Sequence, residues 1–336
     1  MKRVLLTGAS GFVGSHVLRH IILNTDWFVV CPVTFMHKGL QDRIRMAIED
    51  LPGAGDRIKT VRCDLSCPIS VITAREFGDI DLVFNLASES HVDRSIKEPA
   101  PFIINNVSLI CHLLDWARNS NIEKFIQIST DEVYGPAYNG HFHVEWEDQH
   151  LPSNPYSASK AAQEDIAFSY WRTYGIPLVI TNTMNIIGET QDPEKYVPMV
   201  MKKILSGEKV SIHGSAEGAI GSRFYLHARN QADGLLYISN LPTPLYGESN
   251  TPARYHIAGE REVDNLEMAL LIAKYMGKTL DYEIVDFHSS RPGHDLRYAL
   301  NQNRIAEAGW KVPVPLEESL ERTVKWTLKH PEWLMI

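Results

Sequence analysis

The sequence predicts an α/β fold in which a doubly wound parallel β-sheet is completed by a smaller α+β portion. Two observations carry this prediction. Short aliphatic runs alternate with amphipathic stretches from residue 4 to about residue 181, and a glycine-rich segment directly follows the first run. Strand–helix alternation of this length is typical of parallel βαβ units. With 336 residues, the chain is long enough for one large domain or two smaller ones.

Six runs are predicted to be buried strands, because each is aliphatic or β-branched and bounded by polar or turn residues. They are Val4–Leu6, Phe28–Cys31, Thr60–Arg62, Leu82–Leu86, Phe125–Ile128 and Leu178–Thr181. Helices are predicted between them, over Phe12–Leu23, Leu40–Glu49, Ile69–Phe77, Ala100–Asn119 and Ala158–Tyr174. In the fourth helix, apolar residues recur every three or four positions and mark one buried face.

Beyond about residue 185 the pattern loosens, as prolines, glycines and polar loops separate shorter helices. These are predicted over Val197–Ser206, Leu266–Met276 and Leu316–Lys329. The expected division is a sheet domain over residues 1–185, to which segments near 223–258 return, and a second portion over residues 186–336. The second portion is expected to complete a cleft at the carboxyl ends of the strands.

Composition and charge exclude several classes of protein. The formal net charge of −8 leaves no basic surface of the kind that binds nucleic acid or an anionic membrane. The four cysteines do not make a disulfide framework. No apolar run approaches the roughly 20 residues that span a bilayer, and the first residues lack the apolar core of a signal peptide. We therefore expect a cytoplasmic enzyme without a nucleic-acid or membrane partner.

A glycine motif follows the first predicted strand. Gly8, Gly11 and Gly14 form G-x-x-G-x-x-G immediately before and within the start of the next helix. Glycine is required where backbone approaches a pyrophosphate, and the N–H groups at the following helix N-terminus attract phosphate. The motif predicts a Rossmann-like domain over residues 1–185, in which Gly8, Gly11, Phe12, Val13 and Gly14 hold a dinucleotide.

The residues that select between NAD and NADP leave both open. An acidic residue normally closes the second strand and binds the adenosine ribose, whereas Val33 stands there in this chain. His37 and Lys38 follow, and either accept a 2′-phosphate or belong to a solvated loop. NAD is the expected cofactor, with NADP as the alternative. Asp64, after the third strand, is either a ligand of the adenine end or a local cap.

A second motif, Tyr156-x-x-x-Lys160, places a phenol and an ammonium on one face of a helix. A nearby ammonium favours the phenolate, which then serves as a general base at neutral pH. The fifth strand ends at Ser129-Thr130, where a hydroxyl can bind the same substrate oxygen. Together with the glycine motif, Thr130, Tyr156 and Lys160 predict a catalytic site.

These residues resemble those of the extended short-chain dehydrogenase/reductases, and most closely the nucleoside-diphosphate-glucose (NDP-glucose) 4,6-dehydratases. The resemblance rests on five blocks in family order, at residues 88–95, 129–135, 156–160, 192–195 and 291–295. It implies conversion of an NDP-hexose, dTDP-glucose above all, to an NDP-4-keto-6-deoxyhexose and water. The implied steps are transient C4 oxidation, C5 deprotonation with loss of the C6 hydroxyl, and hydride return to C6. NAD would stay tightly bound and be recycled in each turnover.

The resemblance also implies roles for single residues. Glu132 would remove the C5 proton and Asp131 would protonate the leaving hydroxyl, since two carboxyls can divide these roles when their pKa values differ. Tyr156 would be the base for the C4 hydroxyl, with Lys160 as its partner and ribose ligand and Thr130 as hydroxyl binder. Further cofactor contacts are implied for Asp64, Leu65, Leu86, Ala87 and Ser88, and substrate contacts for Ser90, Thr130, Asn185, Lys195, Arg291 and His294.

The chain departs from the family pattern where the nucleobase is bound. Ile186–Glu189 follows Asn185 in place of the usual Asn-Tyr-Gly-Pro, and Arg223 lies about one residue out of register. The reaction is therefore predicted more firmly than the base. One alternative is an NDP-sugar 4-epimerase of the same family, which needs no carboxylate pair. The alternative from another class is a non-catalytic dinucleotide-sensing protein.

Two further patterns concern metals and partners. His141-Phe142-His143 has the spacing of a metal pair, but no set of Cys, Asp or Glu at zinc spacing accompanies it, so a polar loop and no metal are predicted. The apolar faces of helices 100–119 and 158–174 exceed what one sheet needs. In the family this helix pair forms a dimer interface, which implies a homodimer; burial within the monomer is the alternative.

Overall fold

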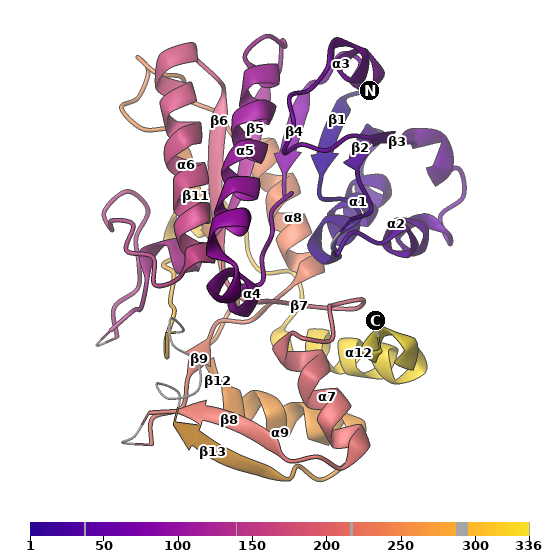
Figure 1. Ribbon diagram of the computed structural model, residues 1–336, viewed down its shortest axis with the longest axis vertical. Coiled ribbons are helices and arrows are strands. Elements are labelled where there is room, and N and C mark those ends of the chain that lie inside the picture. The colour runs from indigo at the N-terminus through magenta and orange to yellow at the C-terminus, as the bar shows by residue number, and fades with distance from the viewer. Residues whose placement is uncertain (37, 139, 216–217, 287–294, 336) are drawn as a thin grey trace.

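A seven-stranded sheet forms the centre of the computed structural model, which describes residues 1–36, 38–138, 140–215, 218–286 and 295–335 (Figure 1). Every neighbouring pair of its strands runs parallel. In sheet order the strands are β11 (Ala253–Ile257), β6 (Leu178–Thr183), β5 (Lys124–Thr130), β4 (Leu82–Asn85), β1 (Arg3–Thr7), β2 (Phe28–Val33) and β3 (Ile58–Arg62). This order reverses direction between β1 and β4, as in a doubly wound fold.

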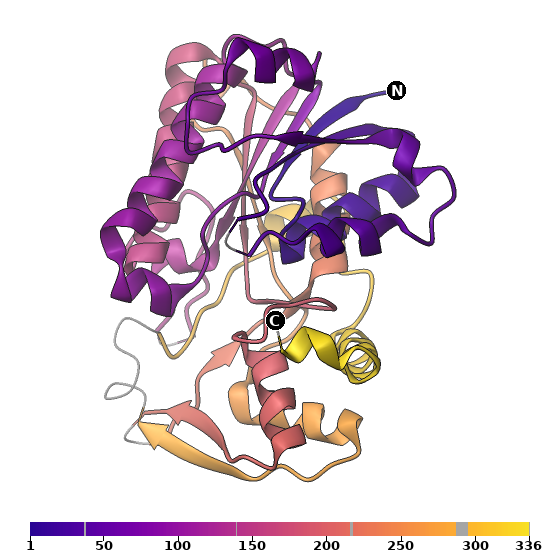
Figure 2. The same cartoon turned by 45° about the vertical axis from the view of Figure 1, so that its right-hand side comes forward.

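Helices cover both faces of the sheet (Figures 1 and 2). One face carries α3 (Val71–Phe77), α5 (Pro99–Ala117) and α6 (Pro155–Tyr174), and the other carries α1 (Phe12–Asn24), α2 (Gln41–Ile48) and α8 (Ala228–Ser239). The alternation of side chains along a strand separates the two cores. In β1, Val4 and Leu6 pack on the α1 side, whereas Leu5 packs on the α5–α6 side. The predicted α/β fold class is confirmed.

The start of α6 differs from the predicted helix 158–174 because a capping box begins it earlier. Asn154 accepts a hydrogen bond from the backbone N–H of Ser157, and the Ser157 hydroxyl accepts one from the backbone N–H of Asn154. Pro155 then occupies the first helical position. Tyr156 consequently lies in the first turn of α6, one helical turn before Lys160.

The smaller portion lies below the carboxyl edge of the sheet in Figure 1 and has its own apolar core. Its elements are β7 (Ile186–Ile187), α7 (Tyr196–Ser206), β8 (Val210–Gly214), β9 (Ser222–Arg223), β10 (Leu226–His227), β12 (Val263–Asp264), α9 (Asn265–Met276), β13 (Tyr282–Asp286), α12 (Leu316–Lys329) and η3 (Pro331–Leu334). They pair as β7–β10, β9–β12 and β8–β13.

Short helices fill the remaining connections. They are η1 (Ala54–Arg57), α4 (Val92–Lys97), η2 (Asp131–Tyr134) and α11 (Asn303–Glu307). Of these, η2 matters most for the site, because it directly continues β5. Within the described residues, no helix has both the length and the apolar character that crossing a membrane requires.

Candidate active site

A pocket of about 650 Å³ lies at the carboxyl ends of β1, β4 and β5, facing the smaller portion. It contains the topological switch point between β1 and β4, where open α/β sheets bind their ligands. The loops after β1, β2, β3, β4 and β5 line it on the sheet side, and residues near 185, 195 and 223 line it on the other. The sheet thus brings motifs that are far apart in sequence to one cavity.

The glycine motif fits a pyrophosphate. A Cβ on Gly14 would lie 2.0 Å from the carbonyl oxygen of Gly8, so only glycine allows this turn to pack against α1. Gly8 has a φ of +71° and a Cβ there would lie 3.0 Å from the backbone nitrogen of Ala87. Among the described side chains none caps α1, so the first-turn N–H groups at Phe12 and Val13 are available to a phosphate.

The remaining predicted cofactor residues also line this pocket: Asp64, Leu65, Leu86, Ala87 and Ser88. Asp64 additionally forms a local turn, since its Oδ1 accepts hydrogen bonds from the backbone N–H of Ser66 at 2.9 Å and from its hydroxyl at 2.7 Å. The two alternatives for Asp64, a cap and a place in the cofactor site, are therefore compatible. The structure shows both its local bonds and its position in the pocket wall.

The ribose end carries Val33 and Lys38. Lys38 Nζ lies 3.4 Å from Glu194 Oε2 and 4.0 Å from Asp192 Oδ1, so carboxylates already balance its charge. That pairing works against capture of an additional 2′-phosphate and favours NAD. His37, the other residue predicted for this role, lies outside the described residues.

Asp131 and Glu132 stand in η2, directly after the end of β5. The Thr130 hydroxyl donates to Asp131 Oδ1 at 2.8 Å, and Asn154 Nδ2 donates to Glu132 Oε2 at 3.3 Å. Asp131 is 3% exposed, and its Oδ2 has no hydrogen-bond partner within the part of the chain that the structure describes. A buried carboxyl oxygen without a partner, in the wall of a pocket, is placed to meet a ligand.

The two carboxyls differ in acidity. Burial, followed by the charge of Glu132, raises the pKa of Asp131 to about 7. Burial also raises the pKa of Glu132, while the hydrogen bond from Asn154 and the charge of Arg223 act to lower it. When one carboxyl of an adjacent pair has a pKa near 7, that carboxyl can hold a proton while the other carries a negative charge.

Tyr156 and Lys160 line the same pocket. Lys160 Nζ donates to the carbonyl oxygen of Ile128 at 2.8 Å and to Gln163 Oε1 at 2.7 Å, and burial lowers its pKa to about 8. Burial and then the charge of Glu132 raise the pKa of Tyr156. The expected lowering of this pKa by Lys160 is therefore absent from the described arrangement, because the ammonium is turned toward β5 and Gln163.

Four of the six predicted substrate residues, Ser90, Thr130, Asn185 and Lys195, line the pocket. Lys195 Nζ donates to the carbonyl oxygen of Ser90 at 3.2 Å. Burial lowers the pKa of Lys195, and the nearby charge of Glu132 raises it. The other two, Arg291 and His294, lie outside the described residues.

A buried ion network behind η2 was not predicted from the sequence. Glu164 Oε2 pairs with Arg254 Nη2 at 2.5 Å, and Glu164 Oε1 accepts from Asn182 Nδ2 at 2.7 Å. Asn182 Nδ2 also donates to the carbonyl oxygen of Thr130 at 3.1 Å, and Arg254 Nη1 donates to the Tyr134 hydroxyl at 2.9 Å. Burial acts to raise the pKa of Glu164, but Arg254 and His150 hold it at about 2. The network therefore holds both ends of η2, at Thr130 and Tyr134.

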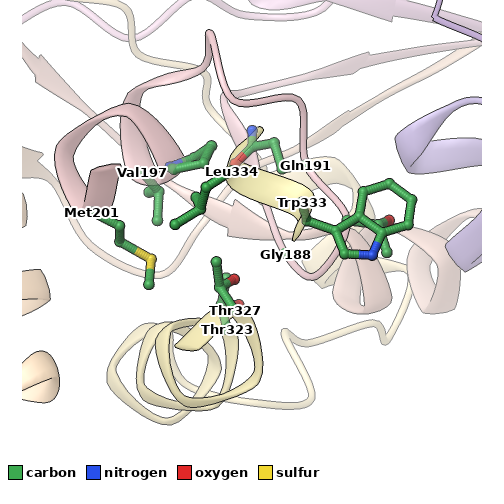
Figure 3. Close-up of a pocket in the computed structure, with 10 residues that line it drawn as sticks. Gly188, Gln191, Val197, Met201, Thr323, Thr327, Trp333 and Leu334 are labelled. Atoms are coloured by element: carbon green, nitrogen blue, oxygen red, sulfur yellow. The ribbon is translucent and has the colours of Figure 1, made fainter. Parts of the chain in front are cut away.

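A second cavity, of about 10 Å³, lies between α7, α12 and η3 (Figure 3). Figure 3 shows Leu334 of η3 beside Val197 of α7, Thr323 and Thr327 of α12 below it, and the Trp333 ring on the side away from α7. A volume of this size is at the lower limit for one water molecule. This cavity is therefore a packing feature, and the large pocket is the candidate site.

The chain is similar to known proteins over nearly its whole length. Residues 4–248 match the model of the NAD dependent epimerase/dehydratase family. The dTDP-glucose 4,6-dehydratase 1 of Escherichia coli is 33% identical over 357 aligned positions, covering 99% of this chain and 94% of the relative. The low-salt glycan biosynthesis protein Agl12 of Haloferax volcanii is 33% identical, covering 98% and 99%. A crystal structure of a Streptomyces venezuelae dTDP-glucose 4,6-dehydratase with NAD bound has a TM-score of 0.85 at 29% identity, covering 98% of each chain.

Proposed function

The chain belongs to the NAD dependent epimerase/dehydratase family, and we propose that within it the protein is an NDP-glucose 4,6-dehydratase, with dTDP-glucose as the favoured substrate. The product is an NDP-4-keto-6-deoxyhexose, released with water. The observation that carries the proposal is the pair Asp131–Glu132, which shares one pocket with Tyr156 and the glycine motif. The names of the dehydratase relatives support the choice of substrate.

NAD would occupy the sheet side of the pocket. When bound, it supplies the hydride chemistry that oxidises C4 and reduces C6, and it ends each turnover in its starting oxidation state. In this proposal, Gly8, Gly11 and the first turn of α1 through Gly14 hold the pyrophosphate. Asp64 and Leu65 would contact the adenine end, Leu86, Ala87 and Ser88 would contact the cofactor from the loop after β4, and Lys160 would bind a ribose hydroxyl.

Tyr156 would take the proton of the C4 hydroxyl, while Thr130 binds the same oxygen. Because burial and Glu132 raise the pKa of this phenol, positive charge has to enter its surroundings before it acts as a base. Lys160, one helical turn further along α6, can provide that charge by turning from Gln163 toward the phenol. Substrate binding is the event that would favour the turn, since it completes the polar surroundings of both groups.

Asp131 and Glu132 would carry the elimination. Asp131, with a pKa of about 7, holds a proton for the C6 hydroxyl, which then leaves as water. Glu132 takes the C5 proton, which the adjacent C4 ketone has made acidic, and returns it to C5 after reduction at C6. The proton that Tyr156 gains equals the one that Asp131 loses, so one internal proton transfer resets the site.

The two alternatives explain fewer of these residues. A 4-epimerase needs Tyr156, Lys160 and the cofactor, but it has no step for the buried pair Asp131–Glu132. A dinucleotide-sensing protein needs the glycine motif alone, and it gives Thr130, Tyr156 and Lys160 no function. Both alternatives also leave the pKa of Asp131 near neutrality unexplained. The dehydratase is the function that uses all of these groups.

On the substrate side, Ser90, Asn185 and Lys195 would contact the sugar and its diphosphate, since all three line the pocket. Arg291 and His294 keep their proposed role at the diphosphate on the basis of the sequence. Lys195 brings a cationic side chain to the pocket wall, where its Nζ donates to the carbonyl oxygen of Ser90, and an ammonium is a suitable partner for a diphosphate.

A homodimer and a cytoplasmic location belong to the same proposal. Helices α5 and α6 pack side by side on one face of the sheet, and Ile104 of α5 is 65% exposed on their outer side. A partner's α5–α6 pair would bury such a residue. All four cysteines are free thiols, as expected for a reducing compartment. Light scattering during size-exclusion chromatography measures the oligomeric state directly.

A panel assay tests the proposed reaction. Purified protein is incubated with dTDP-, UDP-, CDP- and GDP-glucose and with UDP-N-acetylglucosamine, with and without added NAD or NADP, and products are read by mass spectrometry. Loss of one water from one nucleotide sugar is the expected result and identifies the base. Unchanged mass with an altered sugar after hydrolysis assigns the protein to the epimerases. No turnover with any sugar, together with tight dinucleotide binding, supports the sensing protein.

A further inference from the structure

Three metal-ligating side chains meet on the loop that follows η2. The sequence pattern predicts a polar loop around His141 and His143, and the fold adds Asp148 to them. One ligand atom from each of the three residues lies within 4.8 Å of the others. We propose that His141, His143 and Asp148 form a binding site for a divalent cation of the zinc class.

The distances suit a tetrahedral ion. His141 Nε2 lies 2.8 Å from Asp148 Oδ1, and His143 Nδ1 lies 3.2 Å from the same oxygen. A zinc ion with bonds of about 2.0–2.1 Å holds its ligand atoms roughly 3.4 Å apart. The His141–Asp148 contact would have to lengthen by about 0.6 Å, and the His143–Asp148 contact by about 0.2 Å, to reach that spacing. Imidazole nitrogens and a carboxylate oxygen are also the donor set that zinc prefers over magnesium or calcium.

His143 provides an independent sign of a missing ligand. Its side chain is only 7% exposed. Its Nε2 lies 3.3 Å from the carbonyl oxygen of Gly135, which can only accept a hydrogen bond, so this nitrogen carries the proton. In the neutral imidazole Nδ1 then holds a lone pair; it lies 3.2 Å from Asp148 Oδ1 and has no hydrogen-bond partner within the described residues. A lone pair facing a carboxylate oxygen calls for a cation between them.

The surroundings support a cation in other respects. Asp148 Oδ2 accepts the backbone N–H of Val144 at 2.7 Å, which fixes the carboxylate with Oδ1 toward the histidines. Two neutral imidazoles and one carboxylate give the site a net charge of −1. The His141 side chain is 49% exposed, so an ion can enter from solvent and keep a water molecule as fourth ligand.

None of the three residues lines the large pocket, so we expect the ion to stabilise the loop and not to contact the substrate. The His143 ring stacks on the Tyr134 ring in η2, with ring centres 5.1 Å apart. The backbone of His143 also pairs with Ala299 and Asn301 on the returning chain. An ion bound to His143 would fix the position of this residue and thereby stabilise its contacts with η2 and with residues 299–301.

Zinc binding tests the proposal without reference to catalysis. Tag-free protein is stripped with a chelator, desalted and titrated with ZnCl₂ by calorimetry, and the bound metal is counted by mass spectrometry. The informative variant is His141→Gln, because the exposed glutamine keeps a donor for Asp148 but is a poor zinc ligand. Asp148→Asn is the second variant, and His112→Gln on α5 is the matched control. Circular dichroism verifies that each variant is folded.

We expect one Zn²⁺ per chain in the wild type and in His112→Gln, and binding weaker by about tenfold or more in His141→Gln and Asp148→Asn. Zinc should raise the melting temperature only where it binds. Absence of saturable binding to the wild type would overturn the proposal and leave His143 and Asp148 as an ion pair with a protonated imidazole. Equal binding by wild type and His141→Gln would place the metal elsewhere and overturn it as well.

Discussion

Lys38 and Glu194 meet in the wall of the large pocket, with Lys38 Nζ 3.4 Å from Glu194 Oε2. Lys38 follows β2, whereas Glu194 belongs to the segment before α7. The same acidic segment binds Arg43, whose Nη2 lies 3.1 Å from Asp192 Oδ1, and His91, whose Nε2 lies 3.4 Å from Glu194 Oε1. The smaller portion is thus tied across the cofactor end of the pocket to the loops after β2 and β4.

Removal of the ion pairs that Lys38 and Arg43 form with this segment should increase the dissociation rate of bound NAD. Lys38→Met is expected to raise the dissociation rate by no more than about fivefold, because a partly exposed ion pair contributes about 1 kcal/mol or less. Arg43→Met should have the larger effect, since Arg43 is buried and also donates to the carbonyl oxygen of Thr190 at 2.8 Å. The rate is measured on protein loaded with NADH, because the reduced nicotinamide fluoresces whereas that of NAD does not. Lys325→Met, which breaks the exposed pair with Glu321 on α12, is the control, and equal rates in all three variants would contradict this role.

Exchange at C5 should separate the roles of the two carboxyls. Glu132→Gln removes the base, so both product formation and exchange of the C5 hydrogen with deuterated solvent should fall by about 10²–10⁴-fold. Asp131→Asn should slow loss of water while C5 exchange continues. Mass spectrometry of substrate and product reads both quantities. Asp42→Asn, on an exposed face of α2, serves as control. Wild-type C5 exchange in Glu132→Gln would assign the base to another residue.

The pH dependence of turnover should carry the signature of Asp131. A general acid works in its protonated form, and the pKa of Asp131 is raised to about 7 by burial and the charge of Glu132. Turnover under saturating substrate should therefore decline as the pH rises through about 7. Glu132 works as a base in its charged form, so turnover should also decline on the acidic side. A pH profile of Asp131→Asn that keeps the alkaline decline would show that another group causes it.

Asp131 should also make the protein less stable at high pH. Its pKa is higher in the folded state than the ordinary value of 3.8, so the folded protein binds the proton more tightly than the unfolded chain. The associated stability is fully present below the ordinary pKa and is lost as the pH rises through about 7. Asp131→Asn should raise the melting temperature at pH values above that point. The free energy of unfolding should increase by at most about 4 kcal/mol. A variant that is less stable than the wild type at every pH would contradict this linkage.

Removal of one partner from the buried pair Arg254–Glu164 should be costly. Arg254→Met removes the larger of the two positive charges, Arg254 and His150, that stabilise the buried Glu164 carboxylate. Removal of one partner from a buried ion pair typically costs about 3–5 kcal/mol. The double variant Arg254→Met/Glu164→Gln should recover part of this loss. Denaturant unfolding measures the difference, and Arg45→Met, which breaks an exposed pair with Glu49, is the control. A single variant as mild as the control would show that water already solvates this pair.

The sheet could be predicted from sequence wherever its strands are apolar. β1, β2, β4, β5 and β6 are short aliphatic runs, and each was expected within a few residues of its observed bounds. β11 escaped individual prediction because Arg254 and His256, both buried, alternate with its other residues. Their partners, Glu164 and Tyr134, lie about 90 and 120 residues away in sequence. Only the fold shows that these polar side chains face each other and not solvent.

The candidate site also combines features that local motifs predict with features that only the fold shows. Tyr156, Lys160, Thr130, Asp131 and Glu132 stand in local motifs, and the structure places all of them in one pocket wall. The direction of the Lys160 ammonium could not be predicted, because it depends on Gln163 and on a carbonyl oxygen of β5. Likewise, the sequence does not predict that Asp148 lies beside His141 and His143, because its distance from them along the chain matches no known spacing of metal ligands. A turn of the loop, closed by the bond from the backbone N–H of Val144 to Asp148, brings it back to the two histidines.

The order of strands in the sheet also governs how the chain reaches this structure during its synthesis. When residue 185 leaves the ribosome, the outer edge of β6 has no neighbouring strand, and Glu164 lacks Arg254, the larger of its two counter-charges. Strand and arginine both arrive with β11, some 70 residues later. An open strand edge beside a buried anion is a place where nascent chains associate wrongly. The early half of this protein therefore depends on its later half for protection as well as for completing the pocket.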